Sequence, residues 1–155
     1  MAEGVSASSL QAGFVELASI VRALHGDWSA PVSGYDGWTC HDLLAHLSST
    51  QASLGTVAES STKPAPDGAV AFDPDRWNAS QVRRRTEKDP QELLNEFDMG
   101  TTHLVEVLSD LDLDKKVTVG AFPGYTLRDA MAEMLEHQKH HLDDLRASLH
   151  KHPEL

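Results

Sequence analysis

Histidines are the side chains of this sequence best suited to chemistry at neutral pH, because an imidazole can exchange a proton or bind a metal ion there. The 155 residues include nine histidines and a single cysteine, Cys40. One cysteine can form no internal disulfide and cannot build a zinc site of the multi-cysteine kind. A metal ion bound by this chain would therefore be held by imidazole nitrogens and carboxylate oxygens.

Three histidines have positions that favour a shared site. His137 and His141 are separated by one helical turn, where side chains at i and i+4 meet. Each helical residue advances about 100°, which places His141 about 40° and His137 about 80° from Leu127 in the apolar stripe of their helix. The same count places His46 about 60° from Leu43 on an earlier helix. We therefore expect imidazoles from two helices to meet inside the protein.

A divalent metal ion would explain three converging imidazoles. Buried histidines are costly when protonated and poorly satisfied when neutral, and a bound ion removes both costs. Three protein ligands leave a coordination position open, as in catalytic sites. The alternative is that each histidine is a hydrogen-bonded core residue, which is the commoner role for a single histidine on the edge of an apolar face.

Two other polar side chains near these helices have alternative interpretations. Cys40 lies in the first turn of a helix, where a thiol pKa can be lowered, but it can equally be a small buried side chain. Gln138 falls in the middle of an apolar stripe by the same angular count, about 20° from Leu127. A polar side chain in that position needs a partner, and we expect Gln138 to line the metal site.

The elements that carry these residues are predicted to be helices, because apolar residues recur at three- and four-residue spacing. Thr39 to Asp42 and Thr126 to Asp129 fit the capping box that starts a helix, and Asp89 followed by Pro90 is a similar start signal. A shorter helix is predicted over residues 77–88, and residues 111–125 form an irregular connector with β-like composition. The long predicted helices cover residues 6–24, 39–57, 90–108 and 127–149.

We therefore predict an all-α fold, an up-and-down four-helix bundle with a short irregular connector before the last helix. In such bundles, cofactor sites are built by side chains that point inward from facing helices. The length of 155 residues is typical of one domain. We expect a single domain over residues 1–155.

The charge and hydropathy of the chain exclude several classes of partner. Thirteen Lys and Arg against 24 Asp and Glu give a net charge of −11, which repels nucleic acids and anionic membranes. No stretch of about 18 apolar residues is present, and the first residues do not resemble a secretory signal. We expect a cytoplasmic protein that binds neither nucleic acid nor a membrane and acts on a small molecule.

Three stretches of the sequence resemble one protein family. GYDGWTCHDLLAHLSS and the closing MLEHQKHHLDDLRASL resemble the metal-binding segments of the DinB-like superfamily, in particular its mycothiol-dependent maleylpyruvate isomerase branch. FDPDRWNASQV followed by DPQELLNEF is similar to the third-helix region of that branch. The resemblance covers nearly the whole chain in the right order.

The resemblance implies a DinB-like four-helix bundle that binds Zn²⁺ or Ni²⁺ through His46, His137 and His141, and a homodimer. Characterised relatives use the metal to activate a low-molecular-weight thiol, such as mycothiol or bacillithiol, for isomerisation or S-transfer. The isomerase has a Glu where this chain has His137, and it carries a further C-terminal domain beyond the position of Leu155. We therefore expect a reaction other than maleylpyruvate isomerisation itself.

Three functional hypotheses remain open from the sequence. The first is a metal-dependent transferase or isomerase in which the open metal position holds a thiolate. The second is a hydrolase in which the ion activates water, with Glu133 or Asp42 as general base. The third is a metal-binding module without catalysis, because no chemical machinery besides the three histidines stands out.

Overall fold

The computed structural model describes residues 6–64 and 73–149. In these ranges the chain forms helices joined by irregular segments, with two isolated β-bridges and no strand, so the all-α prediction is confirmed. None of the described helices has the combination of length and apolar character needed to cross a bilayer. The helices are α1 (Ala7–Arg22), α2 (Cys40–Ser60), α3 (Pro74–Arg84), α4 (Pro90–Asp110) and α5 (Leu127–Leu149).

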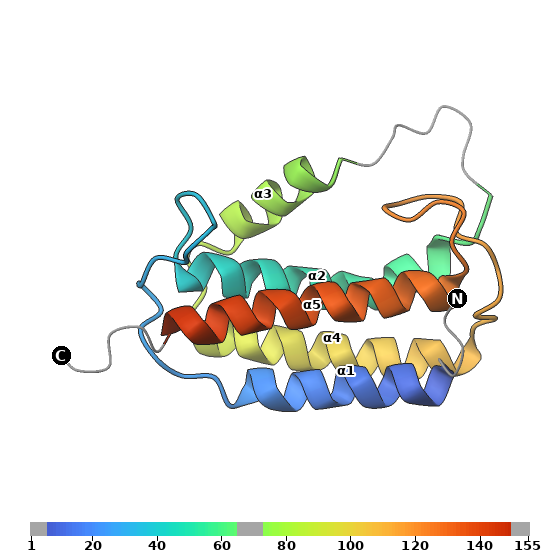
Figure 1. Ribbon diagram of the computed structural model, residues 1–155, viewed down its shortest axis with the longest axis horizontal. Coiled ribbons are helices and arrows are strands. Elements are labelled where there is room, and N and C mark those ends of the chain that lie inside the picture. Colours follow the sequence, from blue (N-terminus) through green and yellow to red (C-terminus); the bar gives the residue numbers. More distant parts are fainter. Residues whose placement is uncertain (1–5, 65–72, 150–155) are drawn as a thin grey trace.

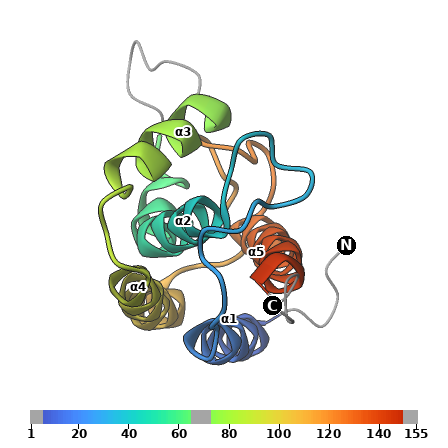
Figure 2. The same cartoon turned by 90° about the vertical axis from the view of Figure 1, so that its left-hand side faces the viewer.

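Four long helices, α1, α2, α4 and α5, lie along a common axis and form the predicted bundle (Figure 1). Helix α2 packs against α4 and α5, and α1 packs against the same two helices, so α1 and α2 are diagonal (Figure 2). The shorter α3 lies on the outer side of α2 and runs back along it. Helix α2 is therefore covered on three sides, and nearly all of its central side chains are buried.

The helices begin where the local sequence supplies a cap. The hydroxyl of Thr39 accepts a hydrogen bond from the Asp42 N–H, and the Asp42 carboxylate accepts one from the Thr39 N–H. Asp89 and Glu92 make the corresponding pair of bonds at the start of α4. The Thr126 hydroxyl accepts from the N–H of residue 129 at the start of α5. These predicted helix starts are confirmed.

Helix α3 differs from its predicted range, since it spans Pro74–Arg84 and not residues 77–88. Asp73 accepts a hydrogen bond from the Arg76 N–H, and Pro74 occupies the first helical turn. This Asp-Pro pair is the same start signal as the one recognised at the next helix, and the sequence prediction overlooked it here.

Close packing of α2 against α4 depends on a glycine. A Cβ atom added to Gly100 would lie 2.6 Å from the backbone oxygen of Gln51 in α2. That contact is with backbone, which cannot move aside as a side chain can, so only glycine permits this approach of the two helices. The backbone of α2 is thereby held against α4 at the level of Gln51.

Buried polar side chains link three of the helices at the same level. The Gln138 amide of α5, 1% exposed, donates from Nε2 to the Gln51 side-chain oxygen at 3.0 Å and to the Leu47 carbonyl at 3.2 Å. Gln51 in turn donates to the Thr101 hydroxyl at 2.9 Å, and this hydroxyl donates to the Phe97 carbonyl. The expectation that Gln138 lines the metal site is wrong, because its partners are in the core.

This network predicts a coupled effect on stability. Gln138→Leu or Gln51→Leu alone leaves the other amide with a buried group that has lost its partner, which costs about 1–3 kcal/mol of unfolding free energy. The double variant removes both amides, so its loss should be clearly smaller than the sum of the two single losses. Urea unfolding monitored by circular dichroism measures all three. Gln91→Leu, on an exposed position of α4, serves as control, and an additive double variant would contradict the network.

Candidate metal centre

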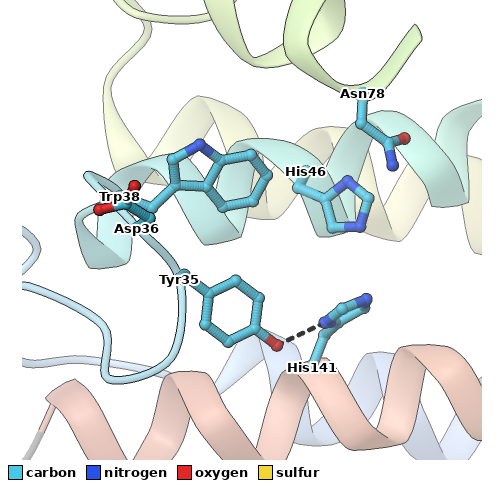
Figure 3. Close-up of a pocket in the computed structure, with 6 residues that line it drawn as sticks. All are labelled: Tyr35, Asp36, Trp38, His46, Asn78 and His141. Carbon is cyan, nitrogen blue, oxygen red and sulfur yellow. Dashed lines mark hydrogen bonds between the residues drawn. The ribbon is translucent and has the colours of Figure 1, made fainter. Parts of the chain in front are cut away.

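A pocket of about 280 Å³ opens between α2, α3, α5 and the loop that precedes α2. His46 points into it from α2 and His141 from α5, and Asn78 faces it from α3 (Figure 3). The residues that line the pocket are Tyr35, Asp36, Trp38, His46, Asn78 and His141.

His46 and His141 face each other across this pocket. Their ring centroids are 4.9 Å apart and their planes are nearly perpendicular, at 84°. His46 is 7% exposed, and the ring of Trp38 packs 5.6 Å from it. The structure thus brings together two of the three predicted ligands, from helices that are far apart in the sequence.

Both imidazoles are held in the neutral form at pH 7. Burial, together with the nearby His141, lowers the pKa of His46 to about 4. Burial and the neighbouring His137 and His140 lower the pKa of His141, against an opposing effect of Asp144. A neutral imidazole keeps one nitrogen lone pair available, which is the form that binds a metal ion.

One nitrogen of His46 lacks a partner in the described part of the chain. Its Nδ1 atom is buried and makes no hydrogen bond there. A buried polar atom without a partner costs roughly 1–3 kcal/mol. Such a cost is expected at a functional site, and two neutral imidazoles that face one pocket are the donor type that zinc and nickel accept.

His137 is placed differently from the other two predicted ligands. It lies one turn before His141 on α5, is exposed, and makes an edge-on contact with Phe122, with the two ring centroids 6.2 Å apart. Across residues 6–64 and 73–149, no three His, Cys, Asp or Glu side chains are close enough together to hold an ion. The ligand set of His46, His137 and His141 therefore stays a prediction, with His137 as the member that has to turn towards the pocket.

Tyr35 connects the loop before α2 to helix α5 at the pocket. Its hydroxyl donates to Asp144 Oδ2 at 2.6 Å and lies 2.7 Å from His141 Nδ1. Burial, followed by the interaction with Asp144, raises the pKa of Tyr35 above its usual value. The hydroxyl consequently keeps its proton throughout the physiological pH range.

The loop residues that line the pocket were missed by the sequence analysis. Gly34 and Gly37 adopt positive φ angles of 87° and 77° on either side of Tyr35 and Asp36, and the Val32 N–H donates to the Trp38 carbonyl. The turn folds these side chains over the start of α2. Their only sequence signal is an aromatic and acidic cluster between two glycines just before the helix that carries a predicted ligand.

The two general bases considered for a hydrolase do not line this pocket. The Asp42 carboxylate accepts hydrogen bonds in the cap of α2, and Glu133 is exposed on α5. The carboxylate that does line the pocket belongs to Asp36. The structure therefore gives no support to Asp42 or Glu133 in that role.

Cys40 is fully buried at the start of α2. Burial, reinforced by the negative charge of Asp27, raises the pKa of its thiol to about 11. The interpretation as a small buried side chain is confirmed, and the alternative of a lowered thiol pKa is wrong.

The buried thiol predicts a simple labelling result. At pH 8 the native protein should react with 5,5′-dithiobis(2-nitrobenzoate) far more slowly than after unfolding in guanidinium chloride, because only an exposed thiolate attacks the reagent. Raising the pH towards 11 should increase the native rate as the thiolate forms. Release of one equivalent of thionitrobenzoate on mixing with native protein at pH 8 would contradict the burial of Cys40.

The sequence matches the model of the family described as the mycothiol maleylpyruvate isomerase N-terminal domain, over residues 10–144. No match was found among curated proteins or among solved structures. The match confirms the resemblance on which the metal and thiol expectations rest. The expected homodimer stays a prediction.

Proposed function

We propose a function from the family of this chain, which belongs to the mycothiol maleylpyruvate isomerase N-terminal domain family of the DinB-like superfamily. The protein is a metal-dependent enzyme that uses a low-molecular-weight thiol for S-transfer or isomerisation. The observation that carries the proposal is the pair of neutral imidazoles, His46 and His141, which face each other across a pocket.

In this proposal His46, His137 and His141 hold one Zn²⁺ or Ni²⁺ ion. His137 and His141 have the i, i+4 spacing at which two imidazoles on one helix can share an ion. His137 joins the pair by leaving its contact with Phe122. When bound, such an ion supplies an electrophilic centre that lowers the pKa of a coordinated thiol.

The rest of the pocket supplies aromatic and polar side chains for binding. Trp38 and Tyr35 form an aromatic wall beside the histidines, with ring centroids 6.0 Å apart. Asn78 presents an amide and Asp36 a carboxylate to the same space. At about 280 Å³ the pocket is near the lower limit of roughly 300 Å³ for small-molecule sites. A pocket of this size can hold one polar end of a low-molecular-weight thiol compound.

The ligand set predicts which histidines control metal content. His46→Gln, His137→Gln and His141→Gln should each weaken zinc binding by more than tenfold, because each removes one of three ligands. His140→Gln should not, because adjacent residues of a helix point about 100° apart, so His140 and His141 cannot share an ion as residues four apart can. Metal content is measured by mass spectrometry after dialysis against a zinc buffer. Zinc at a hundred times its dissociation constant should also raise the unfolding free energy of the wild type by about 2.7 kcal/mol.

Wild-type metal content in His46→Gln or His141→Gln would refute the proposed centre. Wild-type content in His137→Gln alone would refute His137 as a ligand.

Thiol binding at the ion predicts a spectroscopic signal. The cobalt-substituted protein should gain a sulfur-to-cobalt charge-transfer band when a thiol such as mycothiol, bacillithiol or cysteine is added, since the thiolate enters the open coordination position. The hydroxyl analogue of the same compound is the control and should give no band. Absence of a band with every thiol, together with metal-dependent hydrolysis of activated esters, would favour the hydrolase hypothesis instead.

A further inference from the structure

A chain of two hydrogen bonds reaches the pocket from the side opposite His46. It starts at Asp144 on α5, passes through the hydroxyl of Tyr35 in the loop before α2, and ends at His141 Nδ1. The second ring nitrogen of His141, Nε2, lies away from Tyr35 and towards His46 (Figure 3). Asp144 and Tyr35 thus lie one after the other behind one predicted ligand, His141.

The proton positions in this chain follow from the donors available. An ionised carboxylate only accepts hydrogen bonds, and a tyrosine hydroxyl has a single proton to donate. At 2.6 Å from Asp144 Oδ2, the Tyr35 proton is directed to the carboxylate, because hydrogen bonds to a charged acceptor are the stronger ones. The contact of 2.7 Å between Tyr35 Oη and His141 Nδ1 then requires the proton to be on Nδ1.

We propose that Tyr35 and Asp144 are positioning residues that hold His141 in its Nδ1-protonated tautomer, so that the Nε2 lone pair faces the pocket. A neutral imidazole has one N–H and one lone pair, and the opposite tautomer would direct an N–H towards an incoming cation. Hydrogen bonds of this kind behind a ligand fix the tautomer and ring orientation of metal-binding histidines. We call the hydrogen-bonded chain of Asp144, Tyr35 and His141 the relay. Its effect on metal binding rests on the proposed function, whereas the tautomer of His141 does not.

His140 is the other group near this carboxylate. Its Nε2 lies 3.7 Å from Asp144 Oδ2, longer than a hydrogen bond, and its side chain is 77% exposed. His140 also lies beside His141, with ring centroids 6.2 Å apart. The short contact of Asp144 is therefore with Tyr35, and the relay does not need His140.

Removal of Tyr35 and removal of Asp144 should affect the tautomer of His141 differently. In Tyr35→Phe, no group holds the proton at His141 Nδ1, so the tautomer preference weakens. In Asp144→Ala, the Tyr35 hydroxyl is released from the carboxylate and can donate to Nδ1, which drives the proton to Nε2. The larger change is therefore expected in Asp144→Ala. The double variant should return to the behaviour of Tyr35→Phe, because the released hydroxyl is then absent.

The test is a two-dimensional ¹H–¹⁵N spectrum of the metal-free protein at pH 8, labelled with ¹⁵N in the histidine rings. The ¹⁵N shifts of a ring distinguish its two tautomers, and the His141 signals are assigned by their loss in His141→Gln. The wild type should have His141 protonated at Nδ1. Asp143→Ala and Tyr125→Phe are matched controls, because Asp143 and Tyr125 are exposed and stand outside the relay; both should keep the wild-type tautomer.

Zinc affinity, measured by competition with a chromophoric chelator, gives the second readout. It should fall about 10–100-fold in Tyr35→Phe and Asp144→Ala, the usual effect of losing a group behind a ligand, and change less than twofold in the two controls. The relay is overturned if wild-type His141 is protonated at Nε2, or if neither variant changes the tautomer. A wild type that binds no metal but has the expected tautomer pattern would instead refute the proposed function and leave the relay standing.

Discussion

The buried amide pair of Gln51 and Gln138 is the constraint on which the geometry of the pocket depends. The two side chains cross between α2 and α5 where water cannot replace a lost hydrogen bond. A shift of one helix along the other would leave these groups unsatisfied, so the register of α2 against α5 is specified. Gln138 also bonds the carbonyl of Leu47, the residue after His46. The same bonds that satisfy the core thus set His46 opposite His141.

Helix α2 is the element on which the other parts of the pocket assemble. It contacts α3, α4 and α5, and Gly100 allows α4 to approach its backbone closely. This packing leaves the His46 ring, which is 7% exposed, little freedom to turn away from the pocket. The Nδ1 atom of His46 has no hydrogen-bond partner among the described residues, and this is an energetic cost imposed by the packing of α2, of the kind expected at a functional site.

The polar groups around the two imidazoles act on them in opposite ways. Burial and neighbouring histidines favour the neutral rings, whereas Asp144 favours a charged His141. Tyr35 lies between Asp144 and the ring; its hydroxyl accepts a hydrogen bond from His141 Nδ1–H and donates one to the Asp144 carboxylate. A negative charge can thus be placed near the pocket without converting the imidazole to a cation. The arrangement joins a loop residue to a residue more than one hundred positions later in the sequence.

The sequence by itself determined the helices and the inward direction of some of their residues, because caps and apolar spacing are local signals. Thr39, Asp89 and Thr126 mark helix starts, and the angular count placed His46 and His141 near the core. Only the tertiary structure decided that Tyr35 and Asp144 lie behind His141, that Gln138 pairs with Gln51, and that His137 rests against Phe122. These contacts join segments far apart in the chain or involve loop residues without periodicity, so no local pattern predicts them. They follow from how α2 and α5 pack and from where the loop before α2 lies against α5.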